Sequence, residues 1–215
     1  MSTLTLERTE TEVDVASNGT NGIDQHEIKF QFPRQGEWTY EHWLQFPDDG
    51  WKYEIIDGVL YMSPPPTITH QDVAGELFFH MRGFVRTNKL GTVLTAPCGV
   101  RLPMQPVPVE PDILFIRRER RQMLGNRYVE GAPDLVVEVL SRSNADYDRT
   151  IKYQQYERAG VLEHWIINYW DETVAVYHLV EQQYQLTGTF RRGETAVSQV
   201  MTGFQIAVAD LFNLA

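Results

Sequence analysis

The chain has 215 residues, of which 42% are hydrophobic, a composition that suits a globular domain with a packed core. The single cysteine, Cys98, excludes an intramolecular disulfide and a cysteine-rich zinc site. No apolar run approaches the roughly 20 residues that span a bilayer, and no secretory signal is evident, so we expect a cytoplasmic protein with no membrane partner. The net charge of −10 opposes long-range attraction to nucleic acid, unless divalent cations or a local basic patch reverse its sign at the contact.

The N-terminal part divides into a tail and a first small unit. Residues 1–27 are polar and lack periodicity, which predicts a disordered or weakly ordered tail, and residues 28–215 are expected to form one domain. Thr39 is placed to cap a short helix that ends near Phe46. Two strands, 53–57 and 59–62, are expected around Asp57-Gly58, a strong hairpin signal.

A long helix and a series of strands follow. Apolar residues recur at helical spacing from Val73 to Val85, which predicts a core helix with Thr69 as its N-cap and its end near Asn88. The strands expected after it are 92–95, 99–102, 112–116, 135–140, 164–168, 173–179 and 184–189, with a last helical turn over 209–212. The strands 112–116 and 135–140 are largely apolar, which is typical of strands buried on both faces. We therefore predict an α/β fold with one mixed central sheet flanked by helices.

Three acidic residues stand where apolar strands would normally exclude them. Glu138 lies inside the run 134–140, where both faces of the strand are apolar. Asp112 opens the strand 112–116, and Glu54 interrupts the strand 53–57. An unpaired buried carboxylate costs several kcal/mol. Convergence of the three on one divalent cation, Mg²⁺ or Mn²⁺, would offset that cost, because hard cations prefer carboxylate oxygen.

Each acid also has an alternative explanation that the sequence leaves open. Glu138 could pair with a buried lysine or arginine. Asp112, after a proline, could start its strand by accepting backbone hydrogen bonds. Glu54 is close to a hairpin and could face solvent.

Lys152 is the candidate cation for this site. It lies in a helix expected over 147–159, which Gly160 would end in the left-handed conformation. A helix that begins just past the Glu138 strand can bring Lys152 back over the end of that strand. There it could orient a water molecule or stabilise charge on a phosphate. The alternative is an ordinary helix ion pair with Asp148, four residues earlier.

Together these motifs resemble the Uma-two family of endonucleases, within the PD-(D/E)XK restriction-endonuclease-like superfamily. The motifs are Tyr53-Glu54-Ile55-Ile56-Asp57-Gly58, Pro111-Asp112, Val137-Glu138-Val139-Leu140-Ser141, the Lys152–Tyr156 helix segment and Ala159-Gly160-Val161 with Glu163-His164-Trp165. The resemblance covers about residues 38–179 and implies a restriction-endonuclease-like fold. It implies Asp112, Glu138 and Glu54 as metal ligands. The chain departs from the superfamily pattern at Leu140, where a lysine is usual, and Lys152 stands in for that lysine.

The resulting hypothesis is metal-dependent hydrolysis of DNA phosphodiester bonds, with Glu54, Asp112, Glu138 and Lys152 as catalytic residues. A homodimer is suggested by analogy with related folds alone. One alternative is a nucleic-acid-binding module that kept the fold without turnover. Others are a carboxylate-pair hydrolase that acts on a small or sugar substrate without a metal, and an interaction protein whose acids pair with buried arginines.

Three further groups stay outside this hypothesis. His70, at the start of the long helix, could line the cleft, but it is interpreted as a solvent-facing or capping residue. Asp134 forms a second Pro-Asp pair, but it lies at the opposite end of the Glu138 strand. The basic cluster Arg117, Arg118, Arg120 and Arg121 could touch a DNA backbone, or it could be a solvated loop partly neutralised by Glu119.

Overall fold

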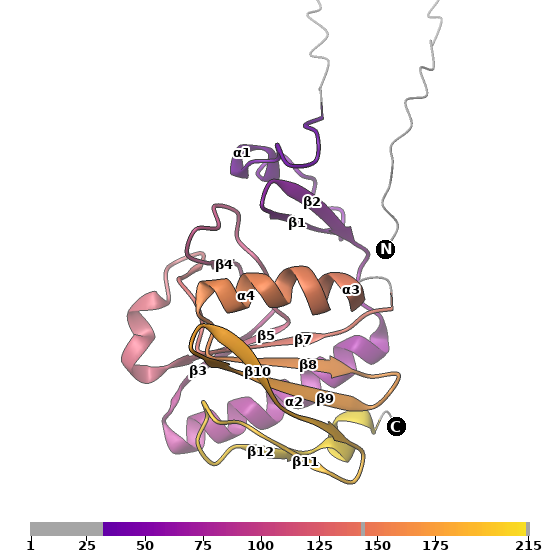
Figure 1. The fold of residues 1–215 in the computed structure, drawn as a ribbon, viewed down its shortest axis with the longest axis vertical. Helices are drawn as coiled ribbons and strands as arrows, with labels where there is room; N and C mark the ends of the chain where they lie inside the picture. Colours follow the sequence, from indigo (N-terminus) through magenta and orange to yellow (C-terminus); the bar gives the residue numbers. More distant parts are fainter. Residues whose placement is uncertain (1–31, 143–144, 214–215) are drawn as a thin grey trace, which may run out of the picture.

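The computed structural model describes residues 32–142 and 145–213, and the tail expected over residues 1–27 lies outside them (Figure 1). The helical elements are α1 (Tyr40–Trp43), α2 (Ile68–Asn88), η1 (Arg118–Met123), α3 (Ala145–Tyr147), the π-helical turn η2 (Asp148–Lys152), α4 (Tyr153–Ala159) and η3 (Val208–Phe212). The strands are β1 (Lys52–Ile56), β2 (Val59–Ser63), β3 (Gly91–Thr95), β4 (Val100–Arg101), β5 (Ile113–Arg117), β6 (Val129–Glu130), β7 (Leu135–Val139), β8 (Glu163–Asn168), β9 (Thr173–Val180), β10 (Gln183–Arg191), β11 (Thr195–Val197) and β12 (Gln205–Ala207).

A six-stranded mixed sheet forms the centre of the molecule, in the order β10-β9-β8-β7-β5-β3. β7 and β8 are parallel, and the other neighbours in this sheet are antiparallel. The parallel pair is the one joined through a helical crossover, the segment α3–η2–α4, as parallel strands require. The predicted α/β fold with a mixed central sheet is therefore confirmed.

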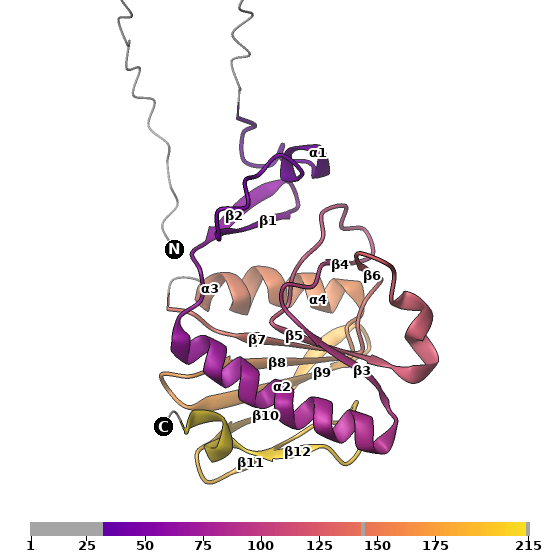
Figure 2. The ribbon, with the colours of Figure 1, turned by 180° about the vertical axis from the view of Figure 1, so that it is seen from behind.

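Helices cover both faces of this sheet, α4 on one face and α2 on the other (Figures 1 and 2). The apolar side of α2, which includes Leu77 and Met81, packs with Val137 and Trp165 and with the C-terminal elements β11, β12 and η3. The opposite core contains Val136 and Tyr156. Alternate residues of β7 thus enter different cores, which explains why this strand is apolar on both faces apart from Glu138.

The N-terminal unit, α1 with the β1–β2 hairpin, lies above the sheet on the α4 side (Figure 1). Asp57 and Gly58 make the expected two-residue turn, with φ of 50° and 74°. A Cβ at Gly58 would lie 2.3 Å from the carbonyl oxygen of Gly36, so the turn needs glycine for space as well as for conformation. This hairpin carries Glu54 toward the sheet.

Several details differ from the sequence prediction. The N-cap of helix α2 is Thr67 and not Thr69, so the helix begins two residues earlier than expected. The Thr67 side chain accepts a hydrogen bond from the His70 backbone N–H, and Thr69 lies in the first turn. The strand expected over 99–102 is shorter and pairs with β6 outside the central sheet, because Val100 packs into the core beneath α4. β6, β11 and β12 were missed, since strands of two or three residues show no alternation.

Among the described residues, no helix combines the length and the apolar character needed to cross a bilayer.

Candidate active site

Asp112 and Glu138 come together because β5 and β7 are antiparallel neighbours. Ile113 faces Val137 in that register, so Asp112, one residue earlier, stands opposite Glu138. The backbone N–H of Val139 donates a 2.8 Å hydrogen bond to Oδ2 of Asp112. Both carboxylates line a cleft of about 990 Å³. Asp112 therefore accepts a backbone hydrogen bond next to the start of its strand, as the alternative explanation for this residue proposed.

Lys152 lies against Glu138. Its Nζ is 3.1 Å from Oε1 and 3.0 Å from Oε2 of Glu138, and the Tyr156 hydroxyl donates a 2.6 Å hydrogen bond to Oε1. Lys152 is 3% exposed and Glu138 2%, so neither charge has bulk water as a partner. The helical crossover after β7 therefore brings Lys152 back over that strand, as expected.

The lysine is carried by the π-helical turn η2, which is inserted between α3 and α4. Such turns are rare and occur frequently at functional sites. Asp148 begins the turn, and its Oδ1 is 3.6 Å from Lys152 Nζ. The helix ion pair that was left open as an alternative is thus present, and it coexists with the contact to Glu138. Gly160 ends α4 at φ 83°, as predicted.

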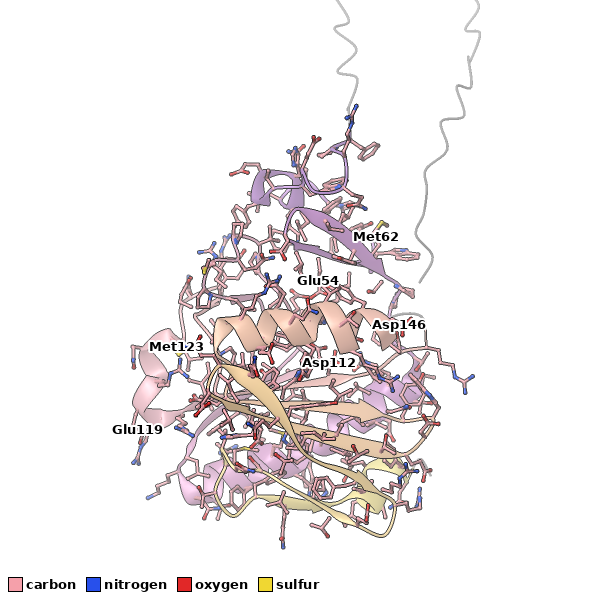
Figure 3. All side chains as sticks on the ribbon, in the orientation of Figure 1. Glu54, Met62, Asp112, Glu119, Met123 and Asp146 are labelled. Atoms are coloured by element: carbon pink, nitrogen blue, oxygen red, sulfur yellow. The ribbon has the colours of Figure 1, made fainter. Side chains whose placement is uncertain are left out.

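Glu54 reaches the same cluster from the hairpin. Figure 3 shows it between β1 and helix α4, with Asp112 at the sheet. Its Oε2 lies 3.5 Å from Lys152 Nζ and 3.4 Å from the Tyr147 hydroxyl, which donates to it. Lys52 lies 3.6 Å from Oε1. Glu54 is only 3% exposed, so the interpretation that it faces solvent is wrong.

Acidic groups outnumber the ammonium groups in this cluster. Four carboxyl groups, Glu54, Asp112, Glu138 and Asp148, share Lys152 and Lys52. Burial, with added repulsion from Asp112 and Asp148, raises the pKa of Glu138 to about 8 against the attraction of Lys152. Burial likewise raises the pKa of Asp148 to about 6. The site therefore carries an excess of negative charge that a cation would relieve.

The same charges lower the pKa of Glu54 and raise the pKa of Lys152. Burial raises the pKa of Glu54, but Lys152 and Lys52 outweigh it, so that the pKa lies below its usual value. Burial also lowers the pKa of Lys152, and the carboxylates of Glu138 and Glu54 hold it well above the usual value. Lys152 is accordingly a permanent cation at neutral pH.

His70 also belongs to this cluster, although the sequence placed it outside. Its Nε2 lies 3.3 Å from Oδ2 of Asp112, and the residue is only 8% exposed, so it is neither solvent-facing nor itself the cap. Contact with His70 lowers the pKa of Asp112 against the effect of burial. The position of His70 in the first turn of α2, next to the cleft, is the only sequence feature that could have indicated this role.

Asp134 and the arginine cluster serve a different purpose. Asp134 is fully buried at the start of β7, where it accepts from the Arg117 backbone N–H at 2.8 Å and from Arg120 at 3.0 Å. Arg118 lies 3.6 Å from Glu119. The Arg117 guanidinium also lies 3.7 Å from Asp134, so three arginines of this cluster are engaged in ion pairs, which favours a structural role for them. The preference for Asp112 over Asp134 agrees with this arrangement.

The donor set fits a divalent cation of the Mg²⁺ type. No three His, Cys, Asp or Glu side chains within residues 32–142 and 145–213 already surround a common metal position. Mg²⁺ does not require three, because it is usually held by one or two carboxylates together with water and substrate phosphate. Asp112 and Glu138 supply such a pair at the cleft, and the excess negative charge favours a cation there. Glu54 lies beside Lys152, with Oε2 3.5 Å from Nζ.

Comparison with known proteins agrees with the fold. A crystal structure described as a putative nuclease of the DUF820 family, from Anabaena variabilis, superposes with a TM-score of 0.65 at 20% identity, over 81% of this chain and 97% of that chain. No curated protein matches the chain. The model of the Uma2 family, described as "Putative restriction endonuclease", matches residues 39–209. With most of its length matched, the chain belongs to the Uma2 family.

Proposed function

We propose that the protein is an endonuclease that hydrolyses DNA phosphodiester bonds with Mg²⁺ or Mn²⁺ as its cofactor. The observation that supports this most strongly is the pairing of Asp112 and Glu138 across β5 and β7, with the Lys152 ammonium 3.0 Å from Glu138, all at one cleft. Such a set of carboxylates and one cation is suited to phosphate chemistry. Membership of a family described as restriction endonucleases points in the same direction.

Each residue of the site would have a separate role. Asp112 and Glu138 would hold the cation, with Glu54 as a further acid that acts on the same site through Lys152. When bound, the cation would polarise the phosphate and lower the pKa of a water molecule. Lys152, kept protonated by its neighbours, would donate hydrogen bonds to the attacking water or to the phosphate oxygens, where negative charge increases in the transition state.

A plasmid-nicking assay with Mg²⁺ or Mn²⁺ tests this proposal. Cleavage by the wild-type protein should fall by about 10²- to 10⁴-fold in Asp112→Ala and Lys152→Ala, the usual contribution of a positioned catalytic group. Arg149→Ala is the matched control, because it removes an exposed cation from the same π-helical turn, and it should cleave like the wild type. Equal cleavage by all four proteins would identify a contaminant and contradict the proposal.

A nucleic-acid-binding module without turnover is the second candidate. The observation that favours it is that Glu138 and Glu54 already hold the Lys152 ammonium, which leaves this lysine engaged by protein carboxylates and not by a reacting phosphate. Salt-dependent binding of DNA without cleavage at any Mg²⁺ or Mn²⁺ concentration would support this candidate over the nuclease.

A further inference from the structure

His70 is held rigidly at the edge of the cleft. It lies in the first turn of α2, where Thr67 caps the helix and accepts a hydrogen bond from the His70 backbone N–H at 3.2 Å. The residue is 8% exposed, and the cleft lined by Asp112 and Glu138 also touches it. The ring therefore has little freedom to move away from the carboxylate that it contacts.

The two ring nitrogens of His70 have different surroundings. Nε2 lies 3.3 Å from Oδ2 of Asp112. Nδ1 is buried and, within the described part of the chain, has no hydrogen-bond partner. A proton on Nδ1 would be buried without an acceptor, whereas a proton on Nε2 has a carboxylate oxygen beside it. The tautomer with hydrogen on Nε2 is therefore favoured, and His70 acts as a donor to Asp112.

Both donors to Asp112 act on the same oxygen. Oδ2 receives the Val139 N–H at 2.8 Å and faces His70 Nε2 at 3.3 Å. Within residues 32–142 and 145–213, Oδ1 takes part in no hydrogen bond or ion pair. A carboxylate fixed through one oxygen presents the other in a constant direction, which is how neighbouring hydrogen bonds orient a metal-binding side chain.

We propose that His70 is a positioning residue for Asp112: its Nε2–H and the Val139 N–H hold Oδ2, so that Oδ1 is the oxygen presented to the divalent cation. This inference rests on the proposed metal-dependent function. His70 is not a ligand in this arrangement, because a cation on Nε2 would move the ring proton to Nδ1, where it would have no acceptor. Its contribution is to reduce the reorganisation of Asp112 when the cation binds.

Binding of Mn²⁺ alone to the full-length protein, measured by calorimetry and by the electron paramagnetic resonance signal of free Mn²⁺, tests the inference. His70→Leu removes the donor and should weaken Mn²⁺ binding by about 10- to 100-fold, as expected for the loss of a group that orients a ligand. His70→Gln keeps an N–H at a similar reach and should bind within about threefold of the wild type. Saturating Mn²⁺ should restore most of the DNA cleavage of His70→Leu.

The other outcomes separate this inference from the proposed function. Wild-type affinity in His70→Leu would overturn the positioning role and leave the nuclease proposal intact. Loss of binding in both His70 variants, equal to that in Asp112→Ala, would make His70 a ligand and also overturn the inference. If the wild type and Asp112→Ala both fail to bind Mn²⁺, the proposed metal-dependent function fails, and the inference fails with it. His70→Gln keeps the test valid if His70→Leu does not fold.

Discussion

At the scale of single residues, the buried Lys152–Glu138 pair connects the candidate site to the stability of the fold. Removing Lys152 also leaves the buried carboxylates of Glu54 and Asp148 without this ammonium partner, and the loss of one member of a buried ion pair costs roughly 3–5 kcal/mol. Lys152→Met should therefore lower the free energy of unfolding by about that amount, as measured by urea denaturation at pH 7. The expected loss is large because both side chains are almost fully buried.

The double variant Lys152→Met/Glu138→Gln is the control for this effect. It removes both partners of the closest contact, and it should recover part of the stability that Lys152→Met loses, because Glu54 and Asp148 still lack their ammonium partner, while it remains inactive in DNA cleavage. A Lys152→Met protein with wild-type stability would contradict the pairing. This comparison also separates the structural contribution of Lys152 from its contribution to catalysis.

The sequence predicted that Lys152 lies over the end of the Glu138 strand, but it did not predict the Asp112–His70 contact, for a physical reason. Glu138 and Lys152 lie on consecutive elements, so the strand-turn-helix geometry alone brings them together. His70 and Asp112 are far apart along the chain, and only the packing of α2 against the sheet places them 3.3 Å apart. Pairings made by tertiary packing cannot be derived from local spacing.

At the scale of elements, the start of α2 determines where His70 lies. Thr67→Ala removes the side-chain cap and should lower the free energy of unfolding by about 1 kcal/mol, the usual cost of losing a threonine cap. Thr69→Ala is the control: it changes the same residue type in the first turn, and it should cost less. Thermal or urea unfolding of the two variants measures the difference. A larger loss for Thr69→Ala would show that the helix begins where the sequence first predicted.

The longer elements were predictable, and the short ones were not. The core helix, the strands β5 and β7 and the Gly160 cap follow from apolar periodicity and from the conformational freedom of glycine. The π-helical turn η2 could not be predicted in this way. Its extra residue does not change the apolar pattern of residues 147–159, which still indicates an ordinary helix. Yet this turn sets the direction of Asp148 and Lys152, so the exact geometry of the site had to come from the structure.

At the scale of the whole molecule, one buried histidine links stability to pH. His164 is fully buried among Tyr153, Tyr156, Tyr177 and Tyr184, and neither ring nitrogen has a partner among the described residues. Burial, with a smaller effect from Lys152, lowers the pKa of His164 from 6.5 to about 3. The unfolded chain binds a proton below pH 6.5 that the folded chain does not bind, so stability is complete above pH 6.5 and is lost progressively toward pH 3.

The variant His164→Phe should remove this contribution and keep the aromatic packing. Between pH 6 and pH 4, the free energy of unfolding of the wild type should fall more steeply than that of the variant, by up to about 1.4 kcal/mol per pH unit. Urea denaturation of both proteins across this range gives the two slopes. Parallel curves would show that His164 is not buried in its uncharged form.

The central claim is that Asp112 and Glu138 together hold a divalent cation at the cleft. Anomalous diffraction from crystals soaked in Mn²⁺ tests it most directly, since Mn²⁺ scatters anomalously and is bound by the same oxygen ligands as Mg²⁺. We expect an anomalous peak within coordinating distance of both carboxylates in the wild type, and none in Asp112→Ala. Crystals of an intact, folded wild-type protein that show Mn²⁺ elsewhere, or that show no peak between these two side chains, would contradict the account.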